Sequence, residues 1–350
     1  MSKYLSSNYE GLIPYVPGEQ PQDQAYIKLN TNESPFPPSP IAQRMARQAA
    51  GDLELYSDPD VKALVNTACD VFGLEKDEIL FFNGSDEALV YCFMAFCDEK
   101  HPACFADITY GFYKVAAGFT RVPYETIPLK SDFSVDTEAF AGCQKNIFLA
   151  NPNAPTGIAL PLSDVEKIIK GNPSNVVIVD EAYVDFGGES ALNLIRKYDN
   201  LIVIQTFSKS RSLAGGRLGF AAACPELIKD LNNLSYSSNP YNVNRMTMAA
   251  GIGALIDREY FEKNLSTIIQ NREWTSERLK ELGFELTDSK TNFVFAKKEG
   301  IGGRSLYLAL KERGILVRHF DSERTRDYIR VTIGSKEQME AFINTIKELS

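Results

Sequence analysis

The sequence predicts an α/β protein with a mainly parallel central β-sheet that is flanked by helices. Between about residue 41 and residue 235, short apolar runs alternate with amphipathic segments, which is the pattern of repeated strand–helix–strand units. Beyond residue 240 the pattern changes to long helices followed by a few strands, which predicts a second, smaller α+β domain. A chain of 350 residues is long enough for two domains and a large core.

The apolar runs give the expected strands of the large sheet, which are residues 79–82, 103–106, 146–150, 176–179, 201–204 and 219–223. Helical patterns fill most gaps, for example at residues 41–50, 87–97 and 164–170. The C-terminal region should begin with a helical stretch from about 242 to 282, followed by strands at 292–295, 315–317 and 328–333 and helices at 306–313 and 336–349. We divide the chain into an N-terminal arm with a short strand at 26–29, a large domain and a small domain, at residues 1–35, 36–240 and 241–350.

Composition excludes several classes of function. The net charge of −9 argues against binding to nucleic acid or to an anionic membrane. No apolar run approaches the roughly 20 residues that span a bilayer, and the first ten residues lack a signal-peptide core. We therefore expect a cytoplasmic protein. The chain has only two histidines and no Cys-x-x-Cys pair among its six cysteines, so we expect free thiols and no metal site.

A loop after one apolar run suits a reactive lysine beside a phosphate. Lys209 follows the run 201–204, and Thr206, Ser208 and Arg217 lie close to it in the sequence. A lysine amine can form an imine with an aldehyde, while hydroxyl groups and a forked guanidinium can hold a phosphate. Pyridoxal phosphate offers both groups. Taken alone, Lys209 also fits a surface lysine or a simple phosphate counter-ion.

A carboxylate ends the neighbouring apolar run. Asp180 follows residues 176–179, and a buried carboxylate at a strand end needs a cation, for which a pyridinium N–H is suitable. Lys209 lies 29 positions later (209 − 180), which fits one strand–helix–strand crossover. The two groups can then hold opposite ends of one ring. Taken alone, Asp180 also fits a helix N-cap or a metal ligand.

Three further stretches place polar or aromatic groups at strand ends. Residues 82–88 supply a strand end, a turn at Gly84 and a helix start, where backbone N–H groups and Ser85 form an anion site or an ordinary N-cap. The turn at 151–157 contains two prolines and a glycine, which favour a rigid turn that can include a cis peptide. Its asparagines can face a ring oxygen. In the third stretch, residues 108–112, Tyr110 can lie flat against the ring or belong to the core.

Together these motifs resemble the fold-type I pyridoxal-phosphate aminotransferases, and within them the histidinol-phosphate aminotransferase subfamily. The resemblance runs from Leu12 to the C-terminus. No single motif is specific, but their order is. In sequence order the motifs are Gly-Ser-Asp-Glu, Thr-Tyr-Gly, Asn-Pro-x-x-Pro-Thr-Gly, Asp-Glu-Ala-Tyr, the Ser-Lys stretch with Arg-x-Gly-Phe, and Ile-Arg-Val-Thr-Ile-Gly.

The resemblance implies a role for each matching residue around pyridoxal phosphate. Lys209 carries the imine and moves the proton between the substrate α-carbon and the cofactor. Asp180 pairs with the ring nitrogen, Tyr183 and an asparagine of the 151–157 turn hold the ring hydroxyl, and Tyr110 stacks on the ring. The phosphate and its surroundings involve Gly84, Ser85, Asp86, Thr206, Ser208 and Arg217.

The resemblance also implies an active-site homodimer and a reaction. Tyr56 matches a tyrosine that reaches the phosphate of the partner subunit's cofactor. Arg330 matches the arginine that holds the carboxylate of glutamate or 2-oxoglutarate, Arg318 and Tyr15 match groups that meet a substrate phosphate, and Asn32 lines the mouth of the site. The implied reaction transfers an amino group between histidinol phosphate and 2-oxoglutarate, giving imidazole-acetol phosphate and glutamate in histidine biosynthesis.

The chain departs from the subfamily pattern in the turn at 151–157. The asparagine that precedes the second proline is replaced by Ala154, so that Asn153 or Asn151 must take its place, and we expect Asn153. The segment 319–327 is charged and has no secure counterpart. Two other reactions therefore stay open, which are an aromatic or broad-range aminotransferase and a threonine-phosphate decarboxylase.

Overall fold

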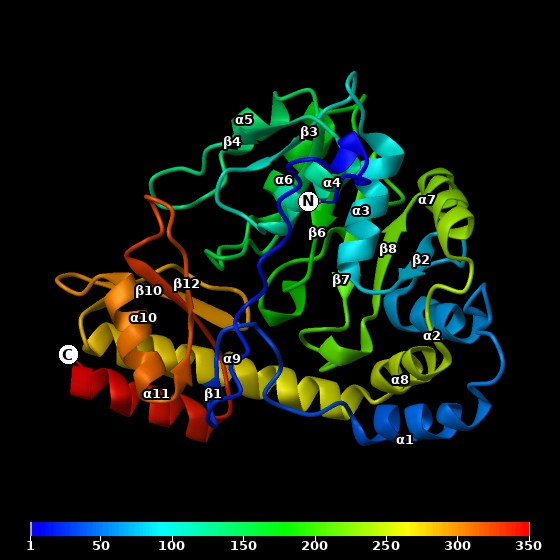
Figure 1. Ribbon diagram of the computed structural model, residues 1–350. Helices are drawn as coiled ribbons and strands as arrows, with labels where there is room; N and C mark the ends of the chain where they lie inside the picture. The colour runs from blue at the N-terminus through cyan, green and yellow to red at the C-terminus, as the bar shows by residue number, and fades with distance from the viewer. Residues whose placement is uncertain (1, 350) are drawn as a thin grey trace.

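The structure is a computed structural model that describes residues 2–349, and its larger part is built on a seven-stranded sheet (Figure 1). The strand order is β2-β8-β7-β6-β5-β3-β4. All neighbours are parallel except β8, which is antiparallel to both β2 and β7. The strands are β2 (Ile79–Phe82), β3 (Ala103–Ala106), β4 (Tyr124–Ile127), β5 (Asn146–Ala150), β6 (Val177–Asp180), β7 (Leu201–Thr206) and β8 (Gly219–Ala223).

Helices cover both faces of this sheet because alternate strand residues point to opposite sides and are apolar on both. In β7, Leu201 and Val203 belong to one core cluster, while Ile202 and Ile204 belong to the other. The first face is covered by α2 (Lys62–Phe72), α5 (Thr137–Ala141), α6 (Leu162–Gly171) and α8 (Arg245–Ile256). The second face is covered by α3 (Ser85–Phe96), α4 (Phe112–Thr120) and α7 (Pro225–Ser238).

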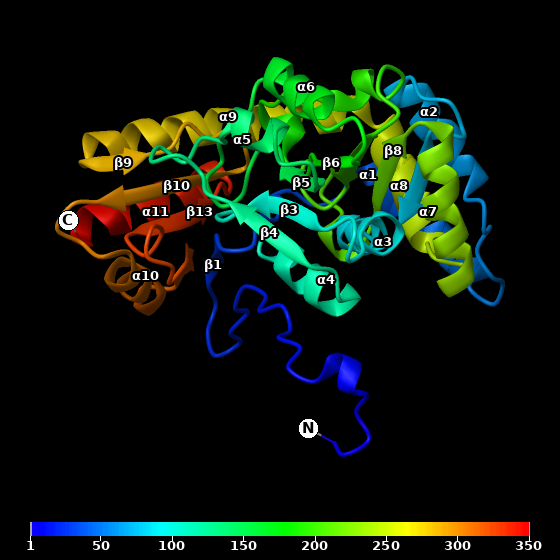
Figure 2. The same cartoon turned by 90° about the horizontal axis from the view of Figure 1, so that it is seen from above.

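The smaller part contains an antiparallel sheet of order β12-β13-β10-β9 with its own apolar core. Its elements are β9 (Phe284–Leu286), β10 (Phe293–Lys298), α10 (Gly303–Glu312), β12 (Arg318–His319), β13 (Tyr328–Thr332) and α11 (Lys336–Leu349). The N-terminal arm joins this part, since β1 (Ile27–Lys28) pairs in parallel with β11 (Ile315–Leu316). Figure 2 shows the segment before β1 extending away from the rest of the molecule.

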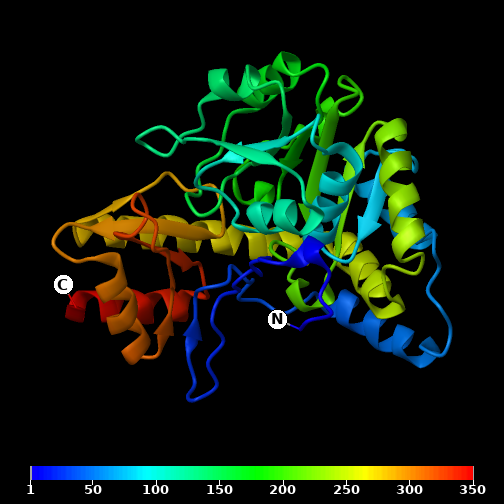
Figure 3. The same ribbon diagram turned by 45° about the horizontal axis from the view of Figure 1, so that its top comes forward.

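One long helix connects the two parts. Helix α9 (Arg258–Glu281) follows α8, which packs against α1 (Pro40–Ala49) and α2, and it runs on to the small sheet (Figure 3). The predicted fold class, a mainly parallel sheet with an added α+β part, is confirmed. The domain boundaries at residues 35 and 240 stay a prediction. None of the helices within residues 2–349 is both long and apolar enough to cross a membrane.

The sequence pattern located the central strands within one or two residues but missed three short ones. Strands β4, β9 and β12 have two to four residues, and β4 is mostly exposed. Such strands lack the buried apolar run by which a strand is recognised. They are held as edge strands by the ladders of β3, β10 and β13.

Candidate active site

Two adjoining cavities lie at the carboxyl ends of the large sheet's parallel strands. The inner cavity, of about 250 Å³, lies against these strand ends. The outer cavity, of about 560 Å³, lies between the large sheet, the N-terminal arm and the small sheet. Their walls share five residues, which are Thr31, Tyr110, Ala154, Tyr183 and Lys209. Ligands of open α/β sheets bind at this edge, and most of the predicted site residues line one cavity or the other.

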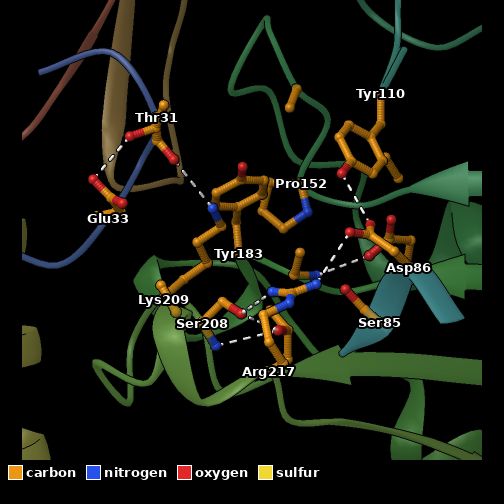
Figure 4. A pocket seen from close by; sticks show the side chains of 16 residues that line it. Thr31, Glu33, Ser85, Asp86, Tyr110, Pro152, Tyr183, Ser208, Lys209 and Arg217 are labelled. Atoms are coloured by element: carbon orange, nitrogen blue, oxygen red, sulfur yellow. Dashed lines mark hydrogen bonds and ion pairs between the residues drawn. The ribbon is translucent and has the colours of Figure 1, made fainter. Parts of the chain in front are cut away.

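Lys209 lies where the two cavities meet. Strand β7 ends at Thr206, and the next turn places Lys209 half-buried at the sheet edge. Its Nζ atom donates a hydrogen bond to the Thr31 carbonyl oxygen at 3.3 Å and lies 5.7 Å from the centre of the Tyr183 ring (Figure 4). A primary amine held by a single long hydrogen bond at a cavity wall is accessible to a ligand in either cavity.

Asp180 is the last residue of β6, the strand next to β7, and it lines the inner cavity. Its Oδ2 atom accepts a hydrogen bond from the Tyr113 hydroxyl at 2.8 Å, and its Oδ1 atom accepts one from the Ala182 N–H at 3.2 Å. No lysine, arginine or histidine within residues 2–349 forms an ion pair with it. Burial raises its pKa to about 6, so a cation supplied by a ligand would further stabilise the ionised carboxylate.

The opposite end of the inner cavity is suited to an anion. Arg217 has a left-handed backbone (φ +52°) and its guanidinium lies 3.4 Å from the Ser208 hydroxyl and 3.3 Å from an Asp86 carboxylate oxygen. Gly84 has a φ of +95°, and a Cβ atom there would lie 2.6 Å from Nη2 of Arg217. A side chain at this position would be strained by the backbone conformation and would displace the Arg217 guanidinium. Ser85 begins α3 just beyond it, so the N–H groups of a helix start face the same cavity.

Hydrogen bonds fix the aromatic and hydroxyl groups around these ends. The Tyr110 hydroxyl donates to Asp86 at 2.9 Å, and burial raises the pKa of Tyr110, so the phenol stays neutral. The Thr206 hydroxyl donates to the Ser208 hydroxyl at 3.0 Å and also accepts the Ser208 N–H at 3.1 Å. Both residues line the inner cavity.

Tyr183 and Asn32 form a wall between the cavities. Asn32 donates from Nδ2 to the Tyr183 hydroxyl at 2.9 Å, and the Thr332 hydroxyl donates to its Oδ1 atom at 3.0 Å. Asn32 is buried in a left-handed conformation with φ +56°, which asparagine tolerates better than most residues. The N-terminal arm thereby orients a residue of the large domain.

The turn at 151–157 does not bring Asn153 to either cavity, which argues against the predicted ring contact. Its amide donates to the Ile108 carbonyl and the Thr156 hydroxyl at 3.0 Å each, and it accepts the Thr109 hydroxyl at 2.7 Å. These bonds hold the side chain inside the protein. Ala154 lines both cavities in its place. The Asn151–Pro152 and Ala154–Pro155 peptides are cis, as the two prolines allowed.

Asn151 does not reach the cavities either. Its side chain accepts the Leu160 N–H at 2.8 Å and donates to the Leu160 carbonyl at 3.1 Å. Neither asparagine is therefore available to a ring oxygen in this arrangement, and the Tyr183 hydroxyl is the group of this wall that remains.

Arg330 carries a half-buried cation at the outer cavity. It lies on β13, donates from Nη2 to the Asn30 carbonyl at 3.1 Å and has Phe293 and Phe320 rings 5.2 and 5.5 Å from its guanidinium carbon. Its Nε atom is buried and has no hydrogen-bond partner within residues 2–349. Burial lowers its pKa. A half-buried guanidinium at a cavity wall is a site for a carboxylate or phosphate.

The N-terminal arm and β12 complete the outer wall. Arg318 holds the arm through hydrogen bonds to the Pro17 and Val16 carbonyl oxygens at 3.3 and 3.4 Å. The Tyr15 ring packs edge-on against Tyr110, with centroids 6.2 Å apart. Arg318 and Tyr15 both line the outer cavity together with Arg330 and Asn32.

The charged segment 319–327 also lines the outer cavity, which the sequence did not indicate. Five of its residues line the cavity, namely His319, Phe320, Asp321, Ser322 and Thr325. Arg324 lies 3.3 Å from the Asp107 carboxylate of the large domain and contacts the Phe133 ring. This segment therefore bridges the two parts of the molecule above the cavity.

Tyr56 lies outside both cavities of its own chain. Its ring is 77% exposed and stacks on Tyr241 with centroids 4.4 Å apart. Its predicted contact with the partner subunit's cofactor stays a prediction. Among residues 2–349, no cluster of three or more histidine, cysteine, aspartate or glutamate side chains could hold a metal ion.

Comparison with known proteins places the chain in a family. The model of the family described as aminotransferase class I and II matches residues 24–346. Histidinol-phosphate aminotransferases of Brachyspira hyodysenteriae and Clostridium acetobutylicum are 48% and 46% identical to the chain over 349 residues, which is 99% of this chain and of each relative. The crystal structure of histidinol-phosphate aminotransferase from Sinorhizobium meliloti in complex with pyridoxal-5'-phosphate has a TM-score of 0.89 and 23% identity, covering 100% of this chain and 99% of that one. The chain belongs to the aminotransferase class I and II family.

Proposed function

We propose that the protein transfers an amino group between L-histidinol phosphate and 2-oxoglutarate. In histidine biosynthesis the reaction runs in reverse, so that glutamate gives its amino group to imidazole-acetol phosphate. The chain is a pyridoxal-phosphate-dependent aminotransferase. Relatives that are 44–48% identical over their full length carry the name histidinol-phosphate aminotransferase. The structural observation that carries the substrate assignment is the outer cavity, where Arg330 and Arg318 face the same space beside Lys209.

The inner cavity fits pyridoxal phosphate by the chemistry of its two ends. Asp180 is a buried carboxylate without a cationic partner in residues 2–349, and Arg217 with the start of α3 offers donors to a phosphate. When bound, the cofactor supplies an electron-withdrawing ring that stabilises negative charge at the substrate α-carbon. Asp180 would hold the ring nitrogen, Tyr183 the ring hydroxyl, and Ser85, Ser208 and Arg217 the phosphate.

Lys209 moves the proton in this proposal. Its Nζ atom lies at the boundary of the two cavities, and the Thr31 carbonyl is its only hydrogen-bond partner among the described residues. The amine can therefore reach both a cofactor in the inner cavity and the α-carbon of a substrate in the outer one. The Thr31 carbonyl and the Tyr183 ring lie beside the amine, and Asn32 fixes the Tyr183 hydroxyl by a hydrogen bond.

Arginines provide the substrate contacts. Arg330 would bind the carboxylate of glutamate or 2-oxoglutarate, and Arg318 with Tyr15 would meet the phosphate of histidinol phosphate. Two arginines suit both substrates, because a guanidinium fork matches carboxylate and phosphate geometry equally well. The volume of about 560 Å³ is large enough for either molecule.

A homodimer belongs to the same proposal. Large apolar side chains of the N-terminal arm are exposed, including Tyr4 at 83% and Ile13 at 77%, and exposed apolar groups of this kind mark an interface. Tyr56 is likewise exposed beside Tyr241. A second copy that covers these surfaces would bring its Tyr56 to the phosphate end of the inner cavity. A cytoplasmic location also stays a prediction.

Steady-state kinetics with matched substrates tests the proposal. Purified holoenzyme is assayed with L-histidinol phosphate, L-histidinol, L-phenylalanine and O-phosphothreonine, with 2-oxoglutarate as acceptor, while glutamate and CO₂ are measured. We expect kcat/KM for histidinol phosphate to exceed that for histidinol by about 100-fold, because a charge-assisted contact contributes roughly 1.5–3 kcal/mol. Equal turnover of phenylalanine would support the broad-range alternative, and CO₂ release from O-phosphothreonine would support the decarboxylase.

A further inference from the structure

A buried tyrosine behind the inner cavity contacts Asp180 but not the cavity itself. Tyr113 lies in the first turn of α4 and is fully buried. Its hydroxyl donates to Oδ2 of Asp180 at 2.8 Å. Tyr113 lines neither the inner nor the outer cavity, so that it can act on a ligand only through a neighbour, and Asp180 is the neighbour to which its hydroxyl donates.

The ring of Tyr113 has little freedom to move. It packs against Phe105, Phe148 and Tyr110 with centroid distances of 5.7, 5.9 and 5.7 Å. Burial raises the pKa of Tyr113 well above its usual value, and the nearby Asp180 charge raises it further. The hydroxyl therefore stays protonated and remains a donor to the carboxylate.

This donor opposes the cost of burying the carboxylate charge. Burial raises the pKa of Asp180, whereas the Tyr113 hydroxyl and the Ala182 N–H lower it, since both donate to the ionised form. Other charged or titratable groups that act on Asp180 or Tyr113 are Asp86, Lys209, Tyr110 and Tyr183. Each carboxylate oxygen receives one donor from the protein and keeps a lone pair for the cavity.

We propose that Tyr113 is a positioning residue, which orients the Asp180 carboxylate and keeps it ionised for the ring nitrogen of pyridoxal phosphate. This inference rests on the proposed function, because it requires Asp180 to pair with that nitrogen. Tyr113, which lies outside the cavity, should therefore be energetically coupled to the ring nitrogen of the cofactor. A coupling of this kind is measured by changing each partner separately and together.

The test compares two cofactors in two proteins. Apoprotein of the wild type and of Tyr113→Phe is titrated with pyridoxal phosphate and with its analogue in which a C–H group replaces the ring nitrogen. We expect Tyr113→Phe to raise the Kd for pyridoxal phosphate by about tenfold, which equals about 1.4 kcal/mol, and to leave the Kd for the analogue unchanged. In Tyr113→Phe, the pH dependence of the bound cofactor's absorbance should shift with pyridoxal phosphate and not with the analogue.

Two further proteins serve as controls. In an Asp180→Asn background, Tyr113→Phe should not weaken pyridoxal phosphate further, because the carboxylate is gone. Tyr91→Phe removes another tyrosine of the same core cluster, whose hydroxyl bonds to Ser238 away from the cavities, and it should leave both Kd values unchanged. Circular dichroism of each apoprotein checks that it is folded.

The outcomes separate the inference from the function on which it rests. If Tyr113→Phe weakens both cofactors equally, or neither, then it does not act through the ring nitrogen and the inference is overturned. If wild type binds the analogue as tightly as pyridoxal phosphate, then Asp180 does not pair with the nitrogen, and the proposed site itself fails.

Discussion

The inner and outer cavities share Lys209 and Tyr183 but are built from different kinds of structure. The inner cavity is formed at the ends of adjacent strands, where Asp180 and Thr206 close β6 and β7. The outer cavity is formed by segments that are distant in sequence, for example Asn32 of the arm and Arg330 of β13. The first is fixed by the register of one sheet, and the second depends on how three regions pack together.

The polar groups of the two cavities also differ in the hydrogen-bond and ion-pair partners that the protein gives them. In the inner cavity, Asp180 has two donors, and Arg217 contacts Asp86 and Ser208. In the outer cavity, Arg330 bonds only to a backbone carbonyl and keeps a buried Nε atom without a partner in the described chain. The inner cavity is preorganised for one ligand, whereas the outer one holds donors that alternate substrates can use. This difference agrees with a bound cofactor and two exchanging substrates.

Removing the group shared by both cavities should have the largest effect. We expect Lys209→Ala to lower kcat by about 10⁴-fold or more, because loss of a positioned proton-transfer group costs roughly this factor. Steady-state and single-turnover assays measure it. Lys229→Ala, an exposed lysine of α7, should retain full activity. A folded Lys209→Ala protein with normal turnover would contradict the proposed role.

A change confined to the outer cavity should affect substrate binding and leave the cofactor in place. We expect Arg330→Lys to raise the KM for 2-oxoglutarate by about 10- to 100-fold, because lysine keeps the charge but loses the two-pronged contact. The Kd for pyridoxal phosphate, measured by fluorescence titration, should stay within about twofold. Arg313→Ala, an exposed arginine of the small domain, is the matched control. If Arg330→Lys raised the Kd for pyridoxal phosphate and left the KM for 2-oxoglutarate unchanged, the two cavities would not be separate in function.

How much could be predicted from the sequence depends on whether a residue lies at the end of a recognisable strand. Lys209, Asp180 and Arg217 each follow or precede a recognisable strand, and the sheet brings them to one edge. Tyr113 could not be selected, because its bond to Asp180 depends on how α4 packs on the sheet. Asn153 was expected to face the ring, yet three hydrogen bonds direct its amide inward. Side-chain direction within an irregular turn is not encoded in residue spacing.

The buried carboxylate of Glu181, next to Asp180 in sequence, should make the stability of the ligand-free protein depend on pH. Glu181 is fully buried and accepts hydrogen bonds from Ser190, Ala191 and Gln205. Burial raises its pKa from 4.5 to about 7. A raised carboxyl pKa favours folding below about pH 4.5, and this contribution is lost as the pH rises through about 7. The shift corresponds to about 3 kcal/mol.

We therefore expect the apoprotein to lose stability between about pH 4.5 and pH 7, and Glu181→Gln to reduce that loss by about 3 kcal/mol. Urea unfolding at several pH values measures it. Burial also raises the pKa of Asp180, so that part of the loss should persist in the variant. Glu285→Gln, an exposed glutamate paired with Lys297, should unfold like the wild type at every pH. An unchanged pH dependence in Glu181→Gln would mean that Glu181 is not protonated on folding.

The smallest expected effect concerns the contact by which the two parts of the molecule meet above the outer cavity. Arg324 of the segment 319–327 lies 3.3 Å from Asp107, and both side chains are about one-third exposed. Arg304 forms a pair of similar length with Asp321 of the same segment, but both of these side chains are more than 70% exposed. An ion pair of the first kind contributes at most about 1 kcal/mol, and an exposed pair contributes less.

Arg324→Ala should thus raise the KM for 2-oxoglutarate about three- to fivefold, while Arg304→Ala should leave it unchanged. Equal effects of both substitutions would mean that general surface charge, and not the contact across the cavity, governs substrate binding.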